Sequence, residues 1–94
     1  MNEVDRVIHE PARLTVMALL SGAEEVDFLF LMRETGLTKG NLSSHLAKLE
    51  EAAYVEIAKT FRGKIPLTLI RMTPRGRTAL AAYRKTMNGL LKRL

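Results

Sequence analysis

The sequence predicts a mainly α-helical fold with one small β-hairpin (α+β), in a single domain that spans residues 1–94. Apolar residues recur at helical spacing in the first half of the chain and again at its C-terminal end. Between residues 55 and 72 the pattern changes to the alternation that is typical of strands. Residues that start or stop helices bracket the helical segments. These three observations favour four helices combined with a hairpin.

The first helix is expected over residues 12–20, which are nearly all apolar. Pro11 suits the first turn of a helix because no backbone hydrogen-bond donor is lost there. Ser21–Gly22 is expected to end the helix. A helix with so few polar residues is expected to be buried, and a short extended segment should follow near Val26.

Two short helices joined by a tight turn are expected next. Asp27 can cap a helix over about 28–34, and Gly36 is a typical end signal for it. Thr38 is a good N-cap for the following helix, over about 38–52. Two short helices with a glycine in the turn between them make a helix-turn-helix.

The helix over 38–52 has one apolar and one polar face. Leu42, Leu46 and Leu49 recur at helical spacing, so this stripe can face a core. The other face carries short polar and basic side chains, which can hydrogen-bond to base edges or phosphates. Such a helix can lie in the major groove of DNA, which is about 12 Å wide. The candidate contact residues are Thr38, Lys39, Gly40, Asn41, Ser43, Ser44, His45 and Lys48. For His45, a partly buried hydrogen-bonding position is an open alternative.

Two strands and a basic turn follow. Residues 55–61 alternate in character, residues 67–72 form a second short strand, and residues 62–66 are expected to join them as the tip of a hairpin. The turn carries two basic residues beside a glycine and is expected to bind phosphates or the minor groove. An arginine near the base of the hairpin can also reach a phosphate. The candidate contact residues of the hairpin are Arg62, Gly63, Lys64 and Arg71.

The last helix is expected to start at Thr73–Pro74, an N-cap followed by proline, and to run to the C-terminus. Its apolar residues are spaced three, four, three and four positions apart, which is the seam of a helix pair. Two heptads are too few for an isolated coiled coil. The seam must therefore pack on this domain or on the same helix of a second subunit. It consists of Leu80, Tyr83, Met87, Leu90 and Leu94.

Charge is distributed unevenly along the chain. Residues 1–34 hold three basic and seven acidic residues, a balance of −4. Residues 35–94 hold twelve basic and three acidic residues, a balance of +9, and this basic part begins just before the polar-faced helix. A one-sided basic surface attracts polyanions, among which nucleic acid is the commonest. A solvated basic surface is the alternative interpretation.

Several classes of function find no support in the sequence. The chain has no cysteine and only two histidines, so neither a transition-metal site nor a cofactor is expected. No nucleophile, paired carboxylates or phosphate-binding loop appears, so no enzyme is expected. No apolar run approaches the roughly 18 residues of a membrane helix, the N-terminus is not expected to be a signal peptide, and a cytoplasmic location is expected. The apolar residues expected in the core include Phe28, Phe30, Leu31, Tyr54 and Phe61.

The sequence resembles the small winged helix-turn-helix transcriptional regulators related to the ArsR and MarR groups. The matching phrases run in family order over nearly the whole chain. They are IHEPARL at 8–14, VDF at 26–28, GNLSSHL at 40–46, KLEEA at 48–52 and LIRMTPRGR at 69–77. Each phrase alone is weakly specific, and their ordered combination carries the resemblance. The cysteine pairs of metal-sensing relatives are absent, which argues against metal sensing.

The resemblance implies a homodimer that binds double-stranded DNA, with an unidentified small-molecule effector as a candidate further partner. The helix over 38–52 would enter the major groove, and a wing over about 61–67 would contact the backbone or the minor groove. The first and last helices would form the dimer interface, through Leu14, Met17, Leu80, Tyr83, Met87, Leu90, Leu91 and Leu94. A winged-helix module that binds proteins without reading DNA is the alternative.

One position departs from the family pattern. Family members usually have glycine after Glu-Glu-Ala, where the helix turns into the strand, and this chain has Ala53. If the backbone is left-handed there, alanine costs about 1 kcal/mol relative to glycine. Otherwise the turn must be built differently.

Overall fold

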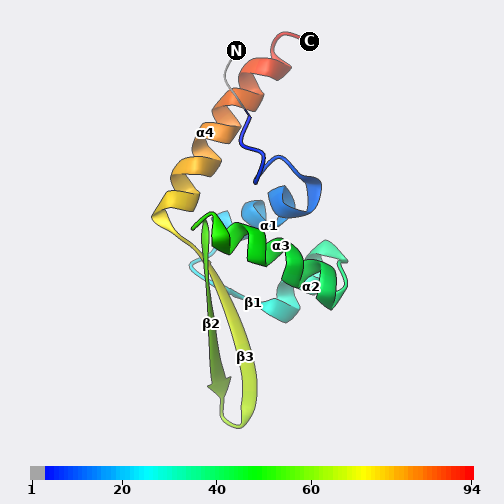
Figure 1. The fold of residues 1–94 in the computed structure, drawn as a ribbon, viewed down its shortest axis with the longest axis vertical. Coiled ribbons are helices and arrows are strands. Elements are labelled where there is room, and N and C mark those ends of the chain that lie inside the picture. Colours follow the sequence, from blue (N-terminus) through cyan, green and yellow to red (C-terminus); the bar gives the residue numbers. More distant parts are fainter. Residues whose placement is uncertain (1–3) are drawn as a thin grey trace.

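The computed structural model describes residues 4–94. Residues 1–3 lie outside the described part. The expectation that the N-terminus is not a signal peptide therefore falls partly on residues that the structure does not describe. The elements are, in order, α1 (Pro11–Ser21), β1 (Val26–Asp27), α2 (Phe28–Thr35), α3 (Lys39–Glu51), β2 (Val55–Arg62), β3 (Ile65–Met72) and α4 (Pro74–Leu91). Helices α1, α2 and α3 form a body, the β2–β3 hairpin extends from one end of it, and α4 extends toward the other end (Figure 1). The expected mainly α-helical fold with a small hairpin is confirmed.

The expected helix caps are present. The Thr38 hydroxyl accepts a hydrogen bond from the backbone N–H of Asn41 at 3.1 Å, and the Thr73 hydroxyl accepts one from Gly76 at 2.9 Å. Gly36 ends α2 in the left-handed conformation, with φ of 71°. Each cap satisfies a backbone group that the helix leaves without a partner. Local chemistry therefore determines where α2 ends and where α3 and α4 begin.

In the described part of the chain, no helix is both long enough and apolar enough to cross a membrane.

The three strands form one antiparallel sheet in the order β1-β3-β2. The hairpin register pairs Arg62 with Ile65, so only Gly63 and Lys64 lie between the strands. The expected five-residue turn over 62–66 is therefore wrong. Pro66, expected in the turn, lies within β3 opposite Phe61, where β3 is paired on one side only. Proline is tolerated at such an edge because no second neighbour requires its missing N–H.

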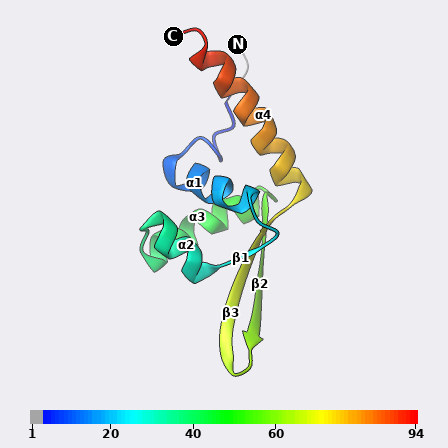
Figure 2. The same cartoon turned by 180° about the vertical axis from the view of Figure 1, so that it is seen from behind.

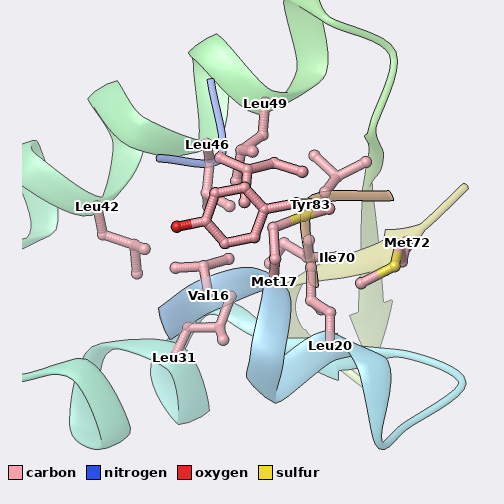
Figure 3. Packing of buried hydrophobic residues seen from close by; sticks show 12 residues of the cluster. Val16, Met17, Leu20, Leu31, Leu42, Leu46, Leu49, Ile70, Met72 and Tyr83 are labelled. Atoms are coloured by element: carbon pink, nitrogen blue, oxygen red, sulfur yellow. The ribbon is translucent and has the colours of Figure 1, made fainter. Parts of the chain in front are cut away.

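The core lies between the three packed helices, α4 and the base of the sheet (Figure 3). Leu42, Leu46 and Leu49 of α3 are buried in it, as their spacing predicted. Leu31 is also buried. Phe61, expected in the core, is 68% exposed because it lies near the far end of the hairpin, away from the helices. The other core residues are Ile8, Val16, Met17, Leu20, Val55, Ile70, Met72 and Tyr83.

The turn from α3 into β2 has a left-handed residue at the position where relatives have glycine. Ala53 has φ of 63°, so the departure noted in the sequence creates backbone strain. Ala53→Gly is expected to raise the free energy of unfolding by about 1 kcal/mol, because glycine adopts this conformation without that strain. Urea denaturation monitored by circular dichroism measures the change.

Ala52→Gly is the matched control for this substitution. Ala52 precedes Ala53 and has φ of −76°, which alanine adopts freely. Glycine there is expected to lower stability by about 0.5–1 kcal/mol, because it adds freedom to the unfolded chain. Equal effects of the two substitutions would show that the strain at Ala53 is negligible.

Candidate functional site

The polar face of α3 is exposed to solvent along its whole length. Helix α1 lies behind α3, as the two opposite views show (Figures 1 and 2). The three leucines of α3 point into the core and thereby turn the opposite side of the helix outward. Seven of the eight candidate contact residues are exposed: Thr38, Lys39, Gly40, Asn41, Ser43, Ser44 and Lys48. All seven are therefore accessible, with Lys39 and Ser43 on the side toward the hairpin and Lys48 on the side toward the N-terminal segment.

A groove of about 580 Å³ separates this face from the hairpin. One wall is α3 and the other is formed by β2 and β3. The polar residues that line it are Lys39, Ser43, Glu50, Lys59 and Thr68. Two lysines therefore face each other across the groove from different elements, with a single carboxylate beside them. This arrangement suits the negatively charged backbone of a nucleic acid.

Lys59 was not among the residues singled out from the sequence. Strand alternation places it on the same face of β2 as Val55 and Ile57, which is the face toward α3. The signal was therefore present in the sequence. What could not be read from the sequence was that this face continues past the core and forms the wall of an open groove.

The tip of the hairpin is basic and exposed. Arg62, Gly63 and Lys64 are all accessible to solvent, and Gly63 has φ of 64°. The sequence has no Asp or Glu after Glu56, so no carboxylate of β3 or α4 offsets these cations. The expected basic tip is thus found where the hairpin extends farthest from the helices.

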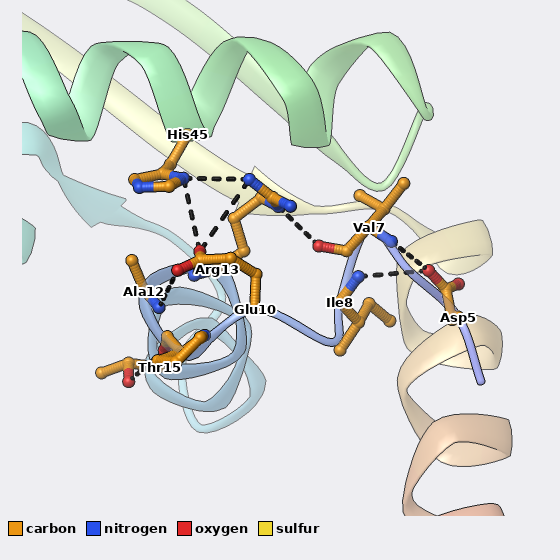
Figure 4. Close-up of polar contacts among 9 residues, drawn as sticks. Asp5, Val7, Ile8, Glu10, Ala12, Arg13, Thr15 and His45 are labelled. Carbon is orange, nitrogen blue, oxygen red and sulfur yellow. Dashed lines mark hydrogen bonds and ion pairs between the residues drawn. The ribbon is translucent and has the colours of Figure 1, made fainter.

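His45 lies differently from the other candidates on α3. Its Nδ1 is 3.1 Å from Nη1 of Arg13 and 3.4 Å from a carboxylate oxygen of Glu10 (Figure 4). The ring is partly buried against the start of α1 and is turned away from the exposed face. Of the two interpretations of His45, the structure therefore favours the partly buried hydrogen-bonding position over DNA contact.

Glu10 and Arg13 hold this cluster together. Glu10 caps α1 by accepting hydrogen bonds from the backbone N–H groups of Ala12 and Arg13 at 3.1 and 2.9 Å. Burial acts to raise the pKa of Glu10, but these hydrogen bonds and the charges of His45 and Arg13 together hold it below its usual value. Arg13 also donates to the carbonyl of Val7 at 2.6 Å. The cluster ties the N-terminal segment, α1 and α3 together.

Arg71 is paired with a carboxylate. It donates to Glu56 at 3.0 Å, and the register places the two residues directly opposite each other on β2 and β3. The Glu56 side chain raises the pKa of Arg71 through this hydrogen bond and its charge. Both side chains of this ion pair are exposed, so a phosphate contact of Arg71 would compete with Glu56 and stays a prediction.

Two of the residues expected at a dimer interface are part of the subunit's own core. Met17 is fully buried, and Tyr83 is buried with its hydroxyl 2.8 Å from Nδ1 of His9. Met17 offers no surface to a second chain, so its assignment to an interface is wrong, whereas Tyr83 still lines the groove between α1 and α4. Leu14, Leu80 and Met87 line the same open groove, which has a volume of about 990 Å³. Beyond it lie the exposed residues Leu90, Leu91 and Leu94.

Comparison with known proteins places this geometry in context. A family model described as a winged helix DNA-binding domain matches residues 12–91. An uncharacterized protein of Methanocaldococcus jannaschii is 38% identical over 79 residues, which cover 83% of this chain and 85% of that protein. A transcriptional regulator homologue from Pyrococcus horikoshii OT3 has a similar solved structure, with a TM-score of 0.88, 24% identity and coverage of 94% of this chain and 87% of that chain. A structure from Enterococcus faecalis V583 assigned to the MarR family of transcriptional regulators gives a TM-score of 0.69 at 22% identity, covering 94% and 84%.

Proposed function

This chain belongs to the family of winged helix DNA-binding domains, and we propose on that premise that it regulates transcription as a homodimer that reads a specific duplex sequence. The resemblance to winged helix regulators is confirmed. The family and the fold are those of DNA-binding regulators rather than of enzymes. The proposal has three parts: the protein recognises a specific DNA sequence, it forms a homodimer, and particular residues contact the DNA.

One observation carries the proposal: the exposed polar face of α3 and the basic hairpin flank the same groove. In the proposed complex α3 lies in the major groove, where Ser43 and Ser44 reach base edges. Lys39 and Lys59 bind phosphates from the two walls of the groove. Arg62 and Lys64 bind the adjoining backbone at the tip of the hairpin. The remaining proposed contacts are Thr38, Gly40, Asn41, Lys48 and Gly63.

The homodimer is proposed to form through the groove between α1 and α4. Leu14, Leu80 and Met87 give this groove an apolar lining, and exposed leucines continue it along α4. A domain of this size buries only a modest core by itself, so a second copy adds stability. Two copies related by a twofold axis would present two α3 helices to one side of a duplex.

Selection of bound fragments from sheared genomic DNA tests the proposal. At roughly 150 mM salt, where surface charges are screened, the full chain is expected to retain fragments that share an inverted repeat. The half-sites should lie about one helical turn apart, roughly 34 Å. Recovery of random DNA that is lost on a modest rise in salt would refute sequence-specific reading, and a chain that binds no DNA would favour a protein-interaction module.

Substitutions in the two parts of the interface are expected to act differently. Ser44→Ala should relax the preference for the selected sequence over random duplex. Arg62→Ala should weaken binding to all sequences and lower the slope of log K against log salt by about one unit, because one phosphate contact is lost. Arg93→Ala, which removes the same charge near the opposite end of the molecule, is the control and should leave the slope unchanged. Electrophoretic mobility shifts over a salt series measure both effects, and identical slopes for the two arginine variants would contradict the role of Arg62.

A further inference from the structure

The tip of the hairpin is apolar on both of its faces. Phe61 and Ile65 are each 68% exposed, although both are large apolar residues. The register pairs Phe61 with Pro66 on the face that continues toward α3, and Ile65 with Arg62 on the opposite face. The hairpin therefore ends in a narrow edge with an aromatic ring on one side and a branched aliphatic chain on the other.

This placement is unlike that of the other exposed apolar residues in the described part of the chain. Leu90, Leu91 and Leu94 lie at the end of α4, and Leu29 lies alone on α2. Single exposed apolar residues are ordinary on protein surfaces. Here two such residues lie on either side of a two-residue turn, far from the core. They form a compact apolar end whose side chains are not buried in the fold.

The charges around this end indicate its partner. Lys59, Arg62 and Lys64 lie within two positions of Phe61 or Ile65 along the hairpin, and the sequence has no Asp or Glu beyond Glu56. A protein partner with an ordinary mixed surface would gain little from such a concentration of positive charge. The tip combines positive charge with exposed apolar side chains. Both properties fit a polyanion whose apolar interior can be reached through a narrow opening between its charged strands. Duplex DNA is such a partner, because its stacked bases lie beneath the phosphates.

We propose that the tip of the hairpin enters the minor groove and that Phe61 acts as a wedge that partly unstacks a base step, while Arg62 and Lys64 hold the flanking phosphates. Apolar side chains such as Phe, Ile and Pro serve this purpose in proteins that deform DNA, and they kink the duplex by about 20–90°. Ile65 packs against the sugars on the other side of the tip. The inference rests on the proposed DNA binding and adds that the bound duplex is deformed and unwound.

Relaxation of a closed circular plasmid tests whether the bound protein unwinds DNA, and it requires no knowledge of the preferred sequence. The full chain is bound to the plasmid, a topoisomerase relaxes it, and the linking number is read on a gel after the protein is removed. Unstacking under the wing is expected to shift the topoisomer distribution of the wild-type sample in proportion to the protein bound. Phe61→Ala should lose most of that shift when compared at equal occupancy, and Phe61→Leu should retain part of it because leucine can also act as a wedge.

Two matched variants separate the wedge from general effects. Leu29→Ala removes an apolar side chain of similar exposure, 64%, outside the hairpin and should leave the shift unchanged. Arg62→Ala should need more protein to reach equal occupancy and then give the wild-type shift. Because Phe61 is exposed, Phe61→Ala is expected to keep the circular dichroism spectrum and thermal midpoint of the wild type.

The outcomes are distinguishable. A wild-type chain that binds the plasmid without shifting its linking number, or a Phe61→Ala variant with the full shift, overturns the wedge and leaves DNA binding in place. A wild-type chain that binds no plasmid even at low salt overturns the wedge and the proposed function together. Binding that depends on Phe61 to vesicles containing phosphatidylserine, with no change in plasmid topology, would assign the tip to an anionic membrane surface instead.

Discussion

Replacing Gly76 with alanine is expected to lower the free energy of unfolding by about 3 kcal/mol, at the upper end of the usual cost of overpacking. A Cβ at Gly76 would overlap the backbone carbonyl of Tyr54 and would lie 2.9 Å from Cγ of Met72. The carbonyl cannot easily move away, because it accepts a hydrogen bond from the backbone N–H of Thr73 at 3.0 Å. The first turn of α4 would have to shift as a whole.

A second glycine of α4 provides the control. Within one subunit a Cβ at Gly89 would meet nothing within 4 Å, so Gly89→Ala brings the better helix propensity of alanine to the isolated subunit. It is expected to raise stability by about 1 kcal/mol. Urea denaturation of both variants measures the two opposite changes, and a Gly76→Ala variant with the wild-type midpoint would show that α4 does not pack against Tyr54 as closely as described.

Met87→Glu is expected to separate the proposed dimer and to reduce affinity for a two-half-site operator by about 10²–10⁴-fold, because the second half-site is then no longer bound within one linked assembly. Met87 is half-buried in the groove between α1 and α4. A carboxylate there would lose hydration on association beside the apolar side chains of Leu14 and Leu80, which opposes dimer formation. Sedimentation equilibrium gives the oligomeric state, and mobility shifts on the selected operator give the affinity.

Ala82→Glu introduces the same charge on the same helix. Ala82 is exposed and does not line the groove, so this variant should stay dimeric and bind as the wild type does, apart from a small effect of the changed net charge. If Met87→Glu also remained a dimer with unchanged affinity, the subunits would associate through another surface. If it became monomeric and kept full affinity, DNA reading would not require two copies.

The features predictable from the sequence are those set by neighbouring residues. Thr38 and Thr73 cap their helices as expected, and Gly36 ends α2, because a cap depends on two or three adjacent positions. The inward stripe of α3 also follows from its own spacing, and with it the exposure of Ser44 on the opposite face. The sequence predicts the strain at Ala53 only as one of two alternatives, since sequence alone does not determine a backbone angle.

The features that escaped prediction depend on contacts between distant segments. His45 turns toward α1 because Glu10 and Arg13 offer it polar partners, and nothing in the composition of α3 reveals them. The pairing of Arg71 with Glu56 depends on the strand register. Phe61, an aromatic residue expected in the core, is exposed because it lies on the hairpin beyond the helices.

Helix α4 is held at two points along its length. It is held at its first turn, where the Thr73 hydroxyl donates to the carbonyl of Ala53 at 2.6 Å, and again at Tyr83, which contacts His9. From Gly76 to Tyr83 the helix rises about 10 Å, and from Gly76 to Leu91 about 22 Å. Leu91 thus lies about twice as far from the first turn as Tyr83 does. A rigid rotation of α4 about its first turn would therefore move Leu91 about twice as far as Tyr83, whose hydroxyl contacts His9.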